Sequence, residues 1–138
     1  MLDTTTDTGA RADRRLREER IAWQTTVRSD GQPQSEPVWF TWDGEGFQTY
    51  SQPDRQKLKN IGRNPRVRLH LSSNNRGGDV VRVECTAEIR DGSPPATEIP
   101  EYFEKYREGI ARIGFDPEGF ARSYSVVLRV TPERWQLW

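Results

Sequence analysis

The chain has 138 residues, of which 21 are basic and 21 acidic, and 33% of its residues are hydrophobic. This length fits one domain, and the balanced charge argues against a nucleic-acid-binding protein, which usually has a net basic surface. One cysteine and one histidine exclude an internal disulfide and argue against a metal site built by the protein. No apolar run approaches membrane-spanning length and the N-terminus lacks a signal peptide's apolar core, so we expect a cytoplasmic protein.

The first elements are expected to be a tail, a helix and a strand. Residues 1–9 are rich in Thr and Asp and predict a flexible N-terminal tail, which leaves residues 10–138 as the single domain. Residues 11–21 are charged and favour a short surface helix. Apolar and polar side chains alternate over residues 23–28, as is typical of a strand, and Asp-Gly at 30–31 suits a tight hairpin turn.

Two more strands and a helix should follow. Residues 37–42 and 47–51 flank a Gly-rich turn and are predicted as the second and third strands of an antiparallel meander. Pro53 and Asp54 suit the start of a short helix over residues 54–63, and Gly62 and Pro65 suit its end.

The second half of the chain predicts further strands and an amphipathic helix. Helical spacing recurs over residues 102–113, and a short helical turn is expected over 118–123. Strand patterns occur at residues 65–72, 81–90, 126–130 and 135–138. Six or seven mostly antiparallel strands with peripheral helices predict a mainly β (α+β) fold, expected to be a closed barrel because closure removes exposed edges.

The basic segment from Ser51 to Ile61 is a candidate binding site. Ser51, Arg55 and Lys57 could converge with backbone N–H groups on one anion, because a helix N-terminus carries partial positive charge. Arg and Lys both form charge-assisted hydrogen bonds with phosphate. The alternative is an ordinary solvated face of a basic helix.

The strand at residues 37–42 offers a second candidate surface. If one face lines the core, Val38, Phe40 and Trp42 belong there and Trp39 points outward. An outward Trp suggests a partner surface or a flat ligand, or else a Trp covered by the helix of residues 101–113.

No catalytic cluster is evident. His70 lies among outward arginines and is expected at the surface, and Cys85 falls on a core face as inert packing. A hydrolytic triad would need a nucleophile beside His70, and nothing indicates one.

Three segments carry a resemblance to a known family: residues 25–33, residues 37–40 and residues 57–67. The last is the most specific, with a Lys, then Asn-Ile, then Asn-Pro-Arg-Val leading into a strand. Together they resemble the pyridoxamine 5'-phosphate oxidase-like split-barrel family, and more narrowly its F420-binding branch. The resemblance implies a split β-barrel that is a homodimer, with a phosphorylated redox cofactor at the dimer interface.

The resemblance also implies roles for individual residues. Lys57, with Arg55 and Ser51, would bind the cofactor phosphate. Val38, Trp39 and Phe40 would run beside the tricyclic ring, and the second subunit would bring Gly78 and Asp79, in a flexible Gly-rich loop, toward the cofactor. The full candidate set for cofactor binding is Val38, Trp39, Phe40, Ser51, Arg55, Gln56, Lys57, Asn60, Gly78 and Asp79.

One departure bears on the cofactor. FMN-binding relatives usually carry adjacent Arg-Lys at this helix start, whereas Gln56 precedes Lys57 here, which favours F420, a deazaflavin, over FMN. No pyridoxal-phosphate substrate signature is seen near the C-terminus, which argues against that oxidase reaction.

The expected function is an F420-dependent oxidoreductase that transfers hydride to or from an organic small molecule. The alternatives are an FMN-dependent reductase or oxidase, and a non-catalytic dimer that carries a cofactor or haem. The sequence identifies neither the substrate nor a catalytic residue. It also leaves open whether residues 98–124 form a lid or brace the barrel.

Overall fold

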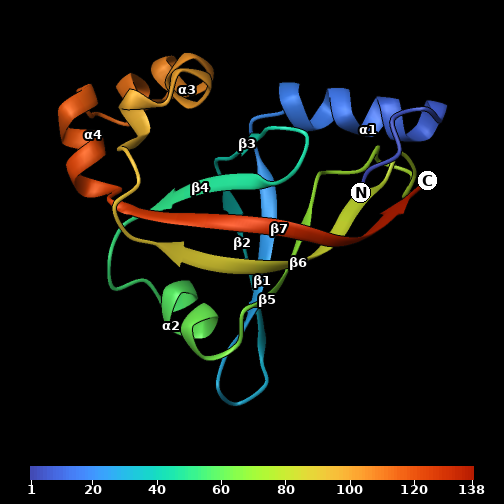
Figure 1. Cartoon of the computed structure of the whole chain (residues 1–138), viewed down its shortest axis with the longest axis horizontal. Coiled ribbons are helices and arrows are strands. Elements are labelled where there is room, and N and C mark those ends of the chain that lie inside the picture. Colours follow the sequence, from blue (N-terminus) through green and yellow to red (C-terminus); the bar gives the residue numbers. More distant parts are fainter.

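The computed structural model describes residues 1–138 as one curled β-sheet with helices packed around it (Figure 1). The helices are α1 (Asp7–Glu18), α2 (Gln56–Arg63), α3 (Pro100–Arg112) and α4 (Pro117–Ser123), with a 3-10 turn at Ala96–Glu98. The strands are β1 (Ala22–Val27), β2 (Pro33–Val38), β3 (Thr41–Trp42), β4 (Phe47–Ser51), β5 (Arg66–His70), β6 (Val81–Arg90) and β7 (Val126–Leu137). None of these helices has the length and hydrophobicity needed to cross a lipid bilayer.

The strand order explains why the sheet curls. All pairings are antiparallel, in the order β2-β1-β5-β6-β7-β4-β3. The two edge strands, β2 and β3, are separated along the chain only by Trp39 and Phe40. A link this short spans at most about 10 Å, so the sheet must bend until its edges approach each other. The expected mainly β fold with peripheral helices is therefore confirmed.

The predicted meander and the closed barrel are wrong in detail. The sequence predicts one strand over residues 37–42, but the structure breaks it at Trp39, and β2 and β3 do not pair. Because β2 pairs with β1 while β3 pairs with β4, the barrel stays split between its two edges.

The C-terminal strand is also longer than predicted. Residues 126–137 form one strand, whose ladder with β6 shifts register between Glu84 and Cys85. Pro132 lies opposite Cys85 and Arg134 opposite Glu84, so Glu133 is the extra residue of a bulge. The bulge accommodates a proline, which cannot donate to a ladder, and the strand continues past it.

The main core fills the concave side of the sheet. Val67, Leu69 and Leu71 are buried as their alternation predicts. The predicted inward set on the other side of the barrel, Val38, Phe40 and Trp42, is buried as well. A second, smaller cluster of buried residues lies under α3 and α4, which sit together in Figure 1 beside the end of β4: Tyr50, Ala96, Tyr102, Tyr106, Ile110, Phe120 and Val127.

The N-terminal segment is more ordered than the sequence suggests. Helix α1 begins at Asp7 rather than at residue 11, because the Thr6 hydroxyl caps it by accepting from the N–H of Gly9 at 3.0 Å. Leu2 lies buried in the main core. The segment expected to be a flexible tail over residues 1–9 is thus packed against the domain.

Candidate functional site

The break between β2 and β3 is held by helix α3. The N–H of Phe40 donates to the hydroxyl of Tyr106 at 2.8 Å, and that hydroxyl donates to the carbonyl oxygen of Arg20 at 2.7 Å. The carbonyl of Phe40 accepts from Lys105 Nζ at 3.0 Å. At the break, the N–H and the carbonyl of Phe40 have no partner in a strand ladder, and side chains of α3 provide their hydrogen bonds instead.

Trp39 packs beneath α3, as one of the two sequence interpretations proposed. Its ring stacks on Tyr106 with centroids 4.7 Å apart and planes inclined by 8°. Gly109 allows this approach, because a Cβ at that position would lie 3.1 Å from Cη2 of Trp39. One edge of Trp39 faces a cavity, so a partner surface is not needed to explain this residue.

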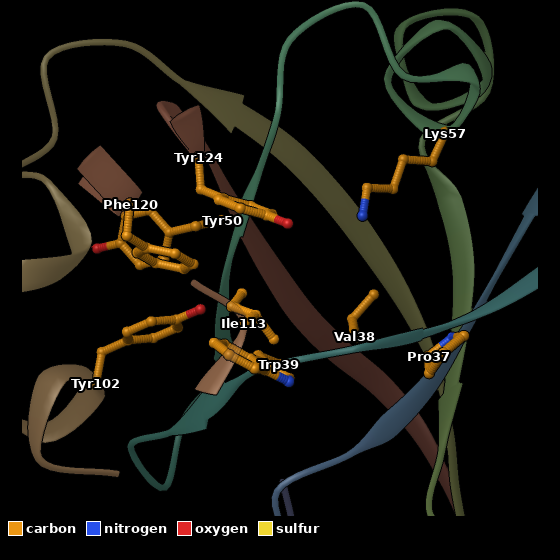
Figure 2. Close-up of a pocket in the computed structure, with 9 residues that line it drawn as sticks. All are labelled: Pro37, Val38, Trp39, Tyr50, Lys57, Tyr102, Ile113, Phe120 and Tyr124. Atoms are coloured by element: carbon orange, nitrogen blue, oxygen red, sulfur yellow. The ribbon is translucent and has the colours of Figure 1, made fainter. Parts of the chain in front are cut away.

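The cavity lies between β2 and the α3–α4 layer and has a volume of about 150 Å³. Its lining is mostly apolar and aromatic, as Figure 2 shows: Pro37, Val38, Trp39, Tyr50, Lys57, Tyr102, Ile113, Phe120 and Tyr124. Residues 100–124 supply four of these side chains. The segment that the sequence left open as lid or brace acts as a brace, because α3 holds the strand break, and both helices form part of the cavity wall.

Lys57 supplies the charge at this cavity. Its side chain is only 14% exposed and reaches from the first turn of α2 toward Val38 (Figure 2). The ammonium group lies 2.8 Å from a carboxylate oxygen of Glu36 on β2, whose side chain is 49% exposed. Because Glu36 is exposed to water, an external anion could replace it as the partner of Lys57.

The other predicted residues of this segment surround the start of α2. The helix begins at Gln56, because Asp54 has a φ of 61° and Arg55 is the N-terminal cap. No side chain caps the first turn. Arg55 is exposed and its guanidinium donates to Gln52, while Ser51 is buried and its hydroxyl donates to the carbonyl of Gln52 at 2.8 Å.

Asn60 and Phe40 point into the barrel rather than the cavity. Asn60 is fully buried, and its amide donates to Thr26 Oγ1 and Gln34 Oε1, both at 2.9 Å. Gln56 in turn donates to Asn60 Oδ1 at 2.9 Å. These contacts attach α2 to β1 and β2, so Asn60 positions the helix that carries Lys57. Phe40 is also fully buried, and its backbone groups are already engaged by α3.

Gly78 and Asp79 lie apart from Lys57 in the same chain. The loop that holds them contacts α1, where the Asp79 carboxylate pairs with Arg11 at 3.1 Å and its carbonyl accepts from Arg15 at 2.6 Å. Trp138 at the C-terminus donates to the carbonyl of Gly77 in this loop at 3.3 Å. Within one chain, therefore, Gly78 and Asp79 do not line the cavity beside Lys57.

Sequence patterns did not reveal the tyrosines of the cavity. Burial raises the pKa of Tyr102 and Tyr50, with neighbouring tyrosines adding to the effect at Tyr102, so both stay neutral hydroxyls at ordinary pH. Tyr102 was recognised only as part of a helical apolar face. The one available signal was the density of aromatic side chains between residues 102 and 124.

The remaining reactive side chains lie outside the cavity. Burial raises the pKa of the Cys85 thiol to about 12, which agrees with its predicted role as inert packing. His70 is half-buried on β5 and lines a groove on the outer face of the sheet. No three His, Cys, Asp or Glu side chains are grouped so that they could hold a metal ion.

Comparison with known proteins shows which other proteins share this architecture. The family model described as pyridoxamine 5'-phosphate oxidase matches residues 9–138. A solved F420 reductase is 26% identical with a TM-score of 0.68, over 88% of this chain and 93% of that one. A candidate pyridoxamine 5'-phosphate oxidase from Listeria innocua is 21% identical with a TM-score of 0.69, over 93% and 95% of the two chains.

Other comparisons are more distant. The haem storage protein of Vibrio cholerae is 16% identical with a TM-score of 0.63, over 91% of both chains, and shares the fold alone. No curated protein matches the sequence significantly. The family model nonetheless spans the whole sheet and all the helices around the cavity, so the chain belongs to the pyridoxamine 5'-phosphate oxidase family.

Proposed function

We propose that this protein is an oxidoreductase that uses F420 to transfer hydride to or from an organic small molecule. The observation that carries the proposal is Lys57, which extends from an uncapped helix start to the edge of an aromatic cavity. The 26% identity with an F420 reductase over most of both chains supports F420 in particular. When bound, such a cofactor supplies the hydride chemistry, and the protein positions it and excludes water.

The phosphate would lie at the start of α2. The free N–H groups of the first helical turn and the ammonium of Lys57 provide donors for an anion there. Arg55 is exposed and can turn toward the same point, while Ser51 would have to release the carbonyl of Gln52. Glu36 would exchange its ion pair with Lys57 for contact with water.

The ring system would lie across the mouth of the cavity. Ligand sites for molecules of drug size usually occupy about 300–1,000 Å³, so a cavity of about 150 Å³ is too small for a tricyclic ring with its phosphate chain. Val38 and Trp39 border the mouth and would contact the ring. The interior of the cavity would stay free for a second, smaller ligand.

A homodimer would complete this site. Trp23 and Trp138 are 36% and 54% exposed and flank a groove of about 860 Å³ on the outer face of β1, β5 and β6. Exposed tryptophans over a wide groove mark a protein interface. A second copy seated there would bring Gly78 and Asp79 of the partner subunit toward the cofactor.

Titration with F420 and with FMN, followed by fluorescence, tests the proposal. We expect tight F420 binding and weak FMN binding, and light scattering of the same samples should give the mass of a dimer. Lys57→Ala should weaken F420 binding by about 1.5–3 kcal/mol, the usual effect of losing a hydrogen bond to a charged group. Lys59→Ala, on the exposed side of the same helix, is the matched control and should leave affinity unchanged.

The outcomes separate the alternatives. A preference for FMN would assign the protein to flavin-dependent reductases or oxidases and make Gln56 a tolerated variation. If neither cofactor binds, the proposal fails, and absorption spectra with added haem then test the non-catalytic alternative. Equal losses of F420 affinity in Lys57→Ala and Lys59→Ala would show that binding depends on general electrostatic attraction and not on a specific contact with Lys57.

A further inference from the structure

Two tyrosine hydroxyls on the cavity wall have no hydrogen-bond partner within the chain. The hydroxyl of Tyr50 accepts from Gln48 at 2.8 Å, and that of Tyr106 bonds to the backbone at the strand break. Tyr102 is only 1% exposed, yet neither its hydroxyl nor that of Tyr124 is bonded. Figure 2 shows the Tyr102 hydroxyl pointing toward Trp39 and Ile113, and the Tyr124 hydroxyl pointing toward Lys57.

The Tyr102 hydroxyl is open to the cavity rather than sealed off from water, since the buried polar atoms without a partner lie elsewhere in the chain. A ligand that displaces water from this hydroxyl is favoured if it offers a replacement hydrogen bond and disfavoured if it does not. Burial raises the pKa of Tyr102, so its hydroxyl keeps its proton and acts as a donor. The side chain is therefore suited to a ligand that presents an oxygen acceptor.

The size and walls of the cavity set the shape of that ligand. An apolar protein cavity of about 150 Å³ holds one benzene-sized ring, and this cavity has the same volume. Trp39, Phe120 and Tyr124 form aromatic walls, which favour a planar ring over a puckered one. The ligand should have a single flat ring.

The charges around the cavity exclude a strongly ionic ligand from its interior. Lys57 is the one ionised side chain that lines the cavity, and it lies at the mouth, paired with Glu36. No carboxylate lines the wall, so a cationic ligand would have no counter-charge inside. An uncharged ligand with an oxygen acceptor fits best.

We propose that the cavity binds a planar, uncharged, single-ring compound whose carbonyl oxygen accepts a hydrogen bond from Tyr102. The inference rests on the proposed function in one respect: it is the proposed function that makes this compound the organic partner of the cofactor. The binding site itself depends on the residues of the cavity, and it can be tested without any cofactor.

Acetophenone is a suitable probe, because α-methylstyrene has the same shape but carries a CH2 group in place of the carbonyl oxygen. Binding is followed by NMR of the purified 15N-labelled chain, using the indole N–H signals of its tryptophans. Trp39→Phe assigns the signal of the cavity, and Trp138 provides a remote reference. We expect acetophenone to shift the Trp39 signal with about fivefold to tenfold higher affinity than α-methylstyrene.

Two variants make the test specific. Tyr102→Phe keeps the ring and should lower acetophenone affinity about fivefold to tenfold, so that the two probes bind alike. Ile113→Trp, at a position 48% exposed at the cavity mouth, should block both probes without disturbing the core.

Each result decides the proposal. Equal binding of the two probes by the parent chain, unchanged acetophenone affinity in Tyr102→Phe, or no shift at Trp39 would overturn it. If acetophenone binds as expected while neither F420 nor FMN binds, this inference stands and the proposed function fails. If F420 or FMN binds but acetophenone does not bind as expected, the proposed cofactor site is retained and the assignment of the cavity fails.

Discussion

The two hydrophobic clusters of this protein differ in composition and in packing. The main core has 18 buried residues, and only Phe40, Trp42 and Phe47 among them are aromatic. The cluster under α3 and α4 has seven, of which four are aromatic: Tyr50, Tyr102, Tyr106 and Phe120. Branched aliphatic side chains fill space closely, whereas rigid rings leave gaps where their edges meet. The cavity accordingly lies beside the aromatic cluster.

This difference suggests that the main core provides stability, whereas the aromatic cluster provides the binding cavity. The main core joins every layer of the barrel and should determine whether the chain folds. The aromatic cluster holds only α3, α4 and the ends of β4 and β7, so it can change with less effect on the fold. Strand β7 joins the two clusters, because Val127 faces the aromatic cluster and Leu128 faces the main core.

The largest expected effect comes from these neighbours on β7. Leu128→Ala should lower the free energy of unfolding by about 3–4 kcal/mol, because it removes a fully buried side chain from the main core. Val127→Ala removes fewer atoms from the looser cluster and should lower it by about 1–2 kcal/mol. Urea denaturation of both variants measures the difference, and equal losses would show that the clusters form one cooperative core.

Substitutions at two glycines in helices should change stability in opposite directions, by less than the larger of the β7 substitutions does. In Gly109→Ala the new methyl group would press on Trp39, which cannot retreat because it also stacks on Tyr106 and Phe120. The overpacking should outweigh the gain in helix propensity and lower stability by about 1–2 kcal/mol. Gly62→Ala in α2 meets no atom within 4 Å and should raise stability by about 0.5–1 kcal/mol.

Thermal and urea unfolding measure both glycine variants, and the indole N–H signal of Trp39 in NMR spectra reports the cavity. Only Gly109→Ala should shift this signal. A stabilised Gly109→Ala would mean that Trp39 moves freely under α3, and the cavity could then not select ligands by shape.

The smallest effect concerns Lys105, which joins the two clusters at the strand break. Burial lowers its pKa from the usual 10.5 to about 8, and the nearby Arg20 adds to the shift. The folded state therefore binds its proton less tightly than the unfolded state does. Stability should rise with pH above the folded pKa of about 8 and stop rising near the unfolded value of about 10.5.

Comparison with Lys105→Met isolates this contribution from other titrating groups. From about pH 7.5 to about pH 9, the parent chain should gain about 1 kcal/mol of unfolding free energy relative to the variant. Urea unfolding across this pH range measures the difference. Parallel pH profiles would show that the contact of the ammonium with the Phe40 ring, 4.0 Å away, offsets its burial.

Much of the fold could be predicted because it depends on local pattern. The inward faces of β5 and of the strand region around Phe40 follow from period-two alternation, and α3 follows from helical spacing. The site was predicted in part. Lys57 and Trp39 both border the cavity, whereas Phe40 and Asn60 face the interior of the barrel. Periodicity indicates on which side of an element a residue lies, but not what covers that side.

The sequence alone determined most of the secondary structure, the resemblance to the split-barrel family and the basic start of α2, since each depends on patterns within short segments of the chain. Only the tertiary structure decided that β2 ends at Trp39, because Tyr106, 66 residues after Phe40, provides the hydrogen bond that replaces the ladder. It also decided that Tyr102, Tyr124 and Lys57 share one cavity. Such contacts join segments far apart in the chain, and the packing of whole side chains selects them rather than any local pattern.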